Sequence, residues 1–142
     1  MATRAKILKQ SENKNLIAVI GDEDTVTGFL LTGIGERNHR GETNFFIVDD
    51  ATPQSAIEEA FQRFLSRQDI AIILVTQKIA DREIKHLISS HDDMLPAILE
   101  IPSKDCPYDP EKDSIMQRAA RQLYGADRAE TELKAPSAKK VA

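Results

Sequence analysis

Residues 16–25 read LIAVIGDEDT, and this stretch decides the fold class. Five apolar residues, several of them β-branched, lead into Gly21 and then into residue types that favour the first turn of a helix. The pattern predicts a buried strand followed at once by a helix, as at the start of an α/β sheet. Ligands of such sheets usually bind at the carboxyl ends of the strands. Here Asp22, Glu23 and Asp24 occupy that end, and their charge disfavours a phosphate group.

The alternation of strand and helix continues along the chain. Further strands are predicted at 45–48, 70–75 and 94–101, and helices from about 25, from 53 and from 77. Thr52 and Thr76 are expected to cap the second and third of these helices. The run at 70–75 is the most apolar, so we place it inside the sheet. The predicted fold is α/β, a four-stranded parallel, doubly wound, Rossmann-like sheet with helices on both faces.

The alternation stops at Pro102. Three prolines between 102 and 110 predict an extended connector, after which Asp113 or Ser114 begins an amphipathic helix that Gly125 ends. The chain is therefore divided into four parts. These are a flexible basic arm at 1–15, an α/β domain at 16–102, the Pro-rich connector with its C-terminal helix at 103–125, and a disordered tail at 126–142.

Charge and composition exclude several classes of function. Of the net charge of -4, residues 1–15 carry +3, residues 125–142 carry +1, and the body between them carries -8. An acidic body disfavours nucleic-acid binding, which depends on Lys and Arg. The single cysteine, Cys106, cannot form an internal disulfide and indicates a reducing compartment. The apolar runs are far shorter than the roughly 20 residues that span a bilayer, so we expect any membrane association to come through a partner.

The most suggestive polar cluster is acidic. The triplet at 22–24 and the pair Asp49 and Asp50 follow two strands that we expect to be neighbours, and Mg²⁺ prefers such ligands. A receiver-like, Mg²⁺-binding regulatory domain is therefore the alternative function. A receiver also needs a fifth strand and a phosphoacceptor Asp after the third, where this chain has Thr76 and Gln77. We interpret the carboxylates as helix caps and expect no catalytic residue, no cofactor and no metal.

Four blocks of sequence together indicate a family. They are IAVIGDEDT at 17–25, GFLLTGIGE at 28–36, PAILEIPSK at 96–104 and PYD at 107–109. In these blocks and their order, the chain from about Leu16 to Tyr124 resembles the F subunits of eukaryotic vacuolar-type proton-pumping ATPases. The resemblance does not extend to the arm before Leu16 or to the tail after Gly125.

The resemblance implies a non-catalytic subunit of the central rotor, in the soluble sector that hydrolyses ATP. It implies binding to the coiled-coil D subunit, with hydrolysis on the A and B subunits of the head, and a part in coupling hydrolysis to rotation and proton transport. It implies a peripheral place on the cytoplasmic face of vacuolar, lysosomal and other endomembranes, with a free cytosolic pool when the complex disassembles. The residues that it implies for contact with the coiled coil are Gly35, Glu36, Arg37, Asn38, His39, Arg40, Ile115, Met116, Ala119 and Leu123.

The C-terminal helix has two alternative positions. Its apolar stripe can pack against a heptad seam of the coiled coil, or it can fold back on its own domain and complete the core. Because the helix follows a Pro-rich connector, it can also swing between the two positions. This gives the hypothesis that the helix regulates hydrolysis or assembly.

Overall fold

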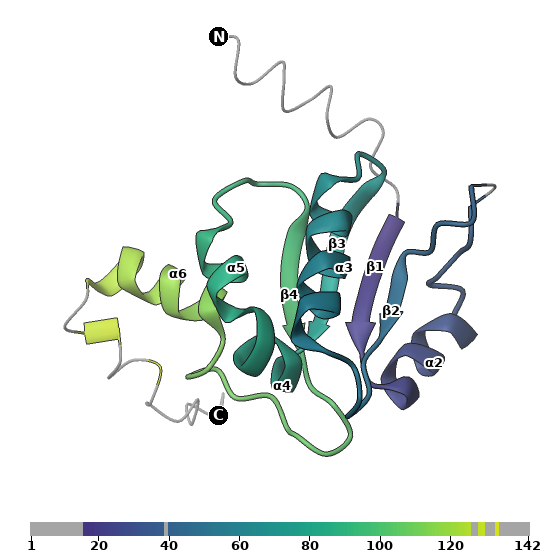
Figure 1. The fold of residues 1–142 in the computed structure, drawn as a ribbon. Coiled ribbons are helices and arrows are strands. Elements are labelled where there is room, and N and C mark those ends of the chain that lie inside the picture. Colours follow the sequence, from purple (N-terminus) through teal and green to yellow (C-terminus); the bar gives the residue numbers. More distant parts are fainter. Residues whose placement is uncertain (1–15, 39, 126–127, 130–132, 134–142) are drawn as a thin grey trace, which may run out of the picture.

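The computed structural model describes residues 16–38, 40–125, 128–129 and 133. The arm predicted at 1–15 and most of the tail predicted at 126–142 lie outside these residues. The described part contains a four-stranded, all-parallel sheet in the order β2-β1-β3-β4 (Figure 1). Its strands are β1 (Leu16–Gly21), β2 (Phe45–Ile47), β3 (Ile70–Thr76) and β4 (Ala97–Ile101). The predicted α/β fold is confirmed, with β1 beside β2 and β3 inside the sheet.

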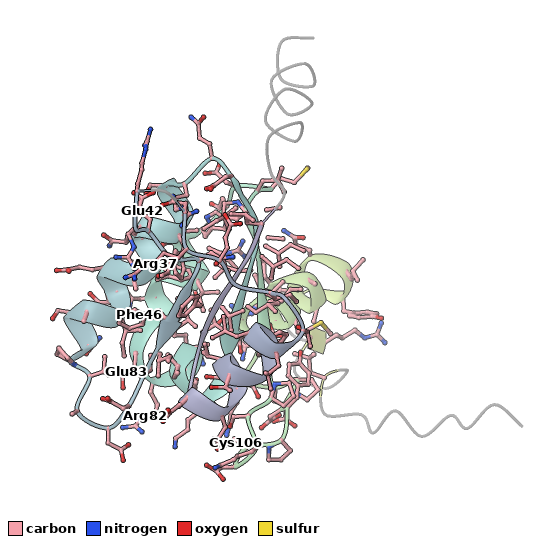
Figure 2. The ribbon with its side chains drawn as sticks, turned by 90° about the vertical axis from the view of Figure 1, so that its right-hand side faces the viewer. Arg37, Glu42, Phe46, Arg82, Glu83 and Cys106 are labelled. Carbon is pink, nitrogen blue, oxygen red and sulfur yellow. The ribbon has the colours of Figure 1, made fainter. Side chains whose placement is uncertain are left out.

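Helices lie on both faces of the sheet, as predicted. Helix α2 (Glu23–Leu31) packs on β1 and β2, and α3 (Gln54–Ser66) covers the opposite face. A continuous helical stretch beside α3 consists of α4 (Gln77–Ile79), a π-helical turn η1 (Ala80–Ile84) and α5 (Lys85–Ser90). Figure 2 shows Arg82 and Glu83 of η1 on this side of the sheet. The last helix, α6 (Ser114–Tyr124), packs against α5. No helix in the described ranges is long and apolar enough to cross a membrane.

The main core lies between the sheet and the layer formed by α3, η1 and α5. Alternate strand residues point into it and meet the apolar stripes of the helices, as the period-two and 3.6-residue patterns predict. The buried members that carry this packing are Ala18, Ile20, Ile73, Val75 and Ile98 from the strands and Ile57, Phe61, Phe64, Ile84 and Ile88 from the helices.

The boundaries of some elements differ from the prediction. Helix α2 begins two residues earlier than expected, at Glu23, because Asp22 caps it. Strand β4 begins at Ala97 rather than 94, since residues 94–96 form a bend. The sequence analysis did not predict the π-helical turn η1. A single wide turn does not change the apolar spacing enough to be visible in the sequence.

Two predicted helix caps are wrong. Helix α3 begins after Pro53, and the Thr52 hydroxyl instead donates to Asp49 at 2.7 Å. Thr76 stands at the N-cap position of α4, but its side chain makes no capping hydrogen bond. At Thr52 a local turn with Asp49 takes the hydroxyl away from the helix, so the residue type alone predicted the wrong hydrogen bond.

Candidate functional site

A crevice of about 460 Å³ lies at the carboxyl ends of β1, β2 and β3. The chain crosses from one side of β1 to the other between β2 and β3, so this is the switch point of the sheet, where doubly wound folds bind ligands. The acidic residues 22–24, Asp49 and Asp50 all line the crevice, as their positions after two neighbouring strands predicted. Three cations, Lys78, Arg82 and Lys104, line it as well.

Three of these five acidic residues, Asp22, Asp24 and Asp49, have side-chain partners within the chain. Asp22 caps α2 by accepting from the backbone N–H of Thr25 at 3.1 Å and from its hydroxyl at 2.8 Å. Asp49 accepts from the Thr52 hydroxyl and a backbone N–H, and these bonds hold the pKa of Asp49 below its usual range. Asp24 pairs with Lys104. Of these three carboxylates only Asp22 caps a helix, whereas Asp49 closes a turn and Asp24 forms an ion pair, so the predicted role as a cap holds for Asp22 alone.

Metal binding and phosphotransfer gain no support from the geometry. No group of three or more His, Cys, Asp or Glu side chains is arranged to hold a metal ion among the residues that the structure describes. Strand β3 ends at Thr76, with Gln77 next, at the position where a receiver carries its phosphoacceptor.

The polar loop between α2 and β2 is an ordered, exposed turn. Arg37 and Thr43 form an antiparallel bridge at its base, and Oδ1 of Asn38 accepts from the backbone N–H groups of Arg40 and Glu42, each at 2.9 Å. Figure 2 shows Arg37 and Glu42 at the end of the molecule away from Cys106. Of the loop residues expected to contact a partner, Glu36, Arg37 and Arg40 are exposed, Gly35 and Asn38 are half-buried, and His39 lies outside the described residues.

Asn44, which the sequence analysis did not single out, attaches this loop to the sheet. It is 2% exposed, accepts from the Glu36 N–H at 2.6 Å and donates to the Ile17 carbonyl at 2.8 Å. Arg67 adds a bond to the Thr43 carbonyl at 2.9 Å and pairs with Asp69, holding the pKa of that carboxyl below its usual range. The base of the loop is therefore fixed while its charged tip faces solvent.

A buried polar network anchors the connector and the start of α6. The Gln77 side chain donates to the Asp109 carbonyl at 2.8 Å and accepts from the Asp109 N–H at 2.7 Å. It also donates to Glu100 at 3.2 Å, and the other carboxylate oxygen of Glu100 accepts from the Ser114 N–H at 3.1 Å. Burial raises the pKa of Glu100, and the nearby Asp113 carboxylate raises it further. The amide and the carboxylate thus connect α4, β4, the connector and α6.

Asp113 caps α6, as predicted. Its Oδ1 accepts from the N–H groups of Ile115 and Met116 at 2.8 and 3.0 Å. Its Oδ2 accepts from the Tyr108 hydroxyl at 2.6 Å, and burial together with this bond raises the pKa of Tyr108. The cap therefore fixes the position of the connector as well as the start of the helix.

Helix α6 folds back on its own domain, the second of the two expected positions. Ile115 packs against the core, and the Arg118 guanidinium donates to the carbonyls of Ser89 and His91 at 2.6 and 2.9 Å, at the end of α5. The outer side of the helix remains exposed, with Leu123 at 76% and Tyr124 at 51%.

The four helix residues expected to bind a partner are thus split between the two sides of α6. Ile115 points inward and Ala119 is half-buried, whereas Met116 and Leu123 are exposed. This position leaves part of the apolar stripe uncovered, and whether a partner contacts these residues stays a prediction.

Comparison with known proteins gives a consistent result. The family model described as ATP synthase (F/14-kDa) subunit matches residues 17–119. The chain is 54% identical to the V-type proton ATPase F subunit of Dictyostelium discoideum over 112 residues, which are 79% of this chain and 92% of the relative. It is 56% identical over 112 residues to the V-type proton ATPase F subunit of Homo sapiens, with the same two shares. It is 56% identical over 104 residues to the probable V-type proton ATPase F subunit of Caenorhabditis elegans, 73% of this chain and 85% of the relative.

Proposed function

The chain belongs to the family of V-type proton ATPase F subunits, and on that premise we propose that it is a non-catalytic component of the central rotor. It binds the coiled-coil D subunit and helps to couple ATP hydrolysis on the A and B subunits of the head to rotation and proton transport. It is peripheral to the membrane, on the cytoplasmic face of vacuolar, lysosomal and other endomembranes, and free in the cytosol when the complex is disassembled. Residues 16–102 are the α/β domain, and 103–125 are its C-terminal extension.

The observation that carries this proposal is the exposed apolar side of α6. Leu123 and Tyr124 are mostly in solvent, and Met116, two turns before Leu123 on the same side, is 43% exposed. Apolar side chains grouped on one side of a helix mark an interaction site. Their helical spacing suits a coiled coil, in which such side chains pack between residues of the facing helix.

The loop that follows α2 supports the proposal as a second contact. Its charged residues Glu36, Arg37 and Arg40 are exposed, and Asn44 fixes its base to the sheet. Because hydrogen bonds already hold the base of the loop, its described residues lose little conformational freedom on binding. Polar side chains of this kind form the rim of an interface and contribute to the choice of partner.

The same structure offers a route to regulation. In the described position, α6 uses Ile115 and Arg118 to hold its own domain, so these two residues are not free to bind the coiled coil. A helix that leaves this position exposes its whole apolar stripe and can present it to the coiled coil. Helix α6 therefore cannot pack on its own domain and bind the coiled coil with its whole apolar stripe at the same time.

The test is the affinity of the full-length chain for the purified coiled-coil D subunit. Leu123→Arg is expected to weaken binding by about tenfold or more, because it places a charge in the apolar contact. Gln122→Arg is the matched control, since it adds the same charge to an exposed neighbour on the same helix and should leave the affinity within about twofold. No binding of the unmodified chain to the coiled coil would refute the proposed function.

Truncation after Pro110 tests the regulatory part. The shortened chain lacks α6 and is expected to bind the coiled coil more weakly and to change the ATPase activity of the reconstituted soluble sector. Equal affinity and equal ATPase activity for the shortened and full-length chains would refute a regulatory role of the helix.

A further inference from the structure

Helix α2 packs on one face of the sheet but covers only the half formed by β1 and β2. In β3, Ile73 and Val75 are buried in the core, whereas Ile72 and Leu74, which point to the other face, are partly exposed. In β4, Ile98 is buried and its neighbour Leu99 is 49% exposed. Burial alternates throughout β4 and from Ile72 to Val75 in β3, which shows that one face of these strands is packed and that the other is partly exposed to solvent.

The exposed residues form one continuous apolar surface, which we call the open sheet face. The strand register places Ile72 beside Ile17 and Ala97, Leu74 beside Leu99, and Thr76 beside Ile101. Each of these residues except Thr76 is aliphatic and at least partly exposed. The open sheet face consists of Ile17, Ile72, Leu74, Ala97, Leu99 and Ile101.

A surface of this kind is unusual in a parallel sheet. Such sheets are normally covered on both faces, because their crossover connections place helices there. Helix α2 covers β1 and β2, where Val19 and Val26 are fully buried. Helix α3 contacts β3 on the core side, and the exposure of Leu74 and Leu99 shows that the helices of the described residues leave the other face of β3 and β4 partly uncovered. The described residues therefore supply no second helix beside α2 in this layer.

We propose that the open sheet face binds one amphipathic α-helix of the coiled-coil rotor partner, an inference that rests on the proposed function. The five residues of β4 extend over about 17 Å, which corresponds to about eleven residues, or three turns, of helix. A helix in this place packs against the side of α2 and on the aliphatic floor, as the missing helix of the layer would.

Charge complementarity specifies the chemistry of this helix. Glu23 and Asp105 are exposed near the carboxyl ends of the strands, and Asp93 is exposed just before β4, at the opposite end. Lys104 also lies at the carboxyl end but pairs with Asp24, so both ends of the open sheet face carry exposed carboxylates. The partner helix carries an aliphatic stripe flanked at its two ends by Lys or Arg, which pair with these carboxylates.

Binding of the full-length chain to the purified coiled-coil partner tests the inference. Leu99→Arg is expected to weaken this binding by about tenfold or more, since the charge would be buried in the centre of the contact. Gln62→Arg is the control, because Gln62 is exposed on α3, which lies on the opposite face of the sheet, and its affinity should stay within about twofold. Both positions are exposed enough for the variants to fold, which thermal unfolding by circular dichroism verifies.

The outcomes separate this inference from the proposed function. If Leu123→Arg weakens binding and Leu99→Arg does not, the proposed function stands and the open sheet face is not the docking site. If the unmodified chain does not bind the coiled coil, the proposed function fails, and this inference fails with it. Loss of binding in Gln62→Arg to the same extent as in Leu99→Arg also overturns the assignment to this face.

A second measurement identifies the occupant directly. In a Cys106→Ser background, which removes the single native cysteine, Leu99→Cys allows an environment-sensitive dye to be attached at the centre of the open sheet face. Adding the coiled-coil partner is expected to shift the emission to the blue, as the dye leaves water. A shift produced by concentrating the labelled chain alone would overturn the inference, because it would show a second copy of this chain on the face. Asp105→Lys should weaken binding most at low salt.

Discussion

Asn44→Ala tests whether the polar loop depends on one buried amide. In the structure this side chain accepts from the Glu36 N–H at 2.6 Å and donates to the Ile17 carbonyl at 2.8 Å. Alanine removes both bonds and leaves a gap at the start of β2. The substitution adds no charge and creates no clash, so the effect measures the two hydrogen bonds and the lost packing.

The loss of stability in Asn44→Ala can be worked out from the hydrogen bond that each partner group, the Glu36 N–H and the Ile17 carbonyl, would lose. A buried polar group left without a partner costs about 1–3 kcal/mol. Glu36 is exposed, so water can reach its N–H and the lower value applies there, whereas the Ile17 carbonyl lies within the sheet and the higher value applies. We therefore expect the free energy of unfolding to fall by about 2–4 kcal/mol, out of the roughly 5–15 kcal/mol typical of a domain.

Urea unfolding followed by far-ultraviolet circular dichroism measures this loss, because the chain has no tryptophan for fluorescence. With a slope of about 2 kcal/mol/M, the midpoint should fall by about 1–2 M urea while the slope stays unchanged. Asn38→Ala is the control. Asn38 organises the exposed tip of the same loop, and its replacement should cost less than about 1 kcal/mol. If Asn44→Ala lowered the free energy of unfolding no more than Asn38→Ala does, the two hydrogen bonds of Asn44 would not hold the loop as described.

Three further predictions concern backbone strain, the buried network and pH. Gly28→Ala should raise the melting temperature and stabilise the fold by about 0.5–1 kcal/mol, because the new Cβ meets nothing within 4 Å. Gly35→Ala should lower the melting temperature, since φ is +132° at this position and the Cβ would collide with Leu30. Gln77→Ala should cost about 2–4 kcal/mol in urea unfolding, because its amide holds both the connector and Glu100, and a loss under about 1 kcal/mol would contradict this. The raised pKa of Glu100 means that ionisation of this carboxyl group disfavours the folded state. The free energy of unfolding of the unmodified chain, relative to that of Glu100→Gln, should therefore rise as the pH falls from about 7 towards about 4. A difference that does not change with pH would contradict the raised pKa of Glu100.

The candidate site was predicted only in outline. The acidic residues after β1 and β2 were expected at one edge, and the structure places them there, because parallel neighbours end on the same side. Asn44, Gln77 and Glu100 were missed. Their importance comes from partners far along the chain, such as the bond from Gln77 to Asp109, and no local pattern indicates such a pair.

Sequence patterns alone predict the α/β class, the four parallel strands, the apolar stripes of the helices and the Asp113 cap, because each depends on spacing or on residue type within a few positions. The folded arrangement is needed to show where α6 lies, which hydroxyls are not caps, and that one face of β3 and β4 stays partly exposed. These features depend on which surfaces meet. A strand with apolar residues on both faces has the same sequence pattern whether the second face is covered by its own chain or left for a partner.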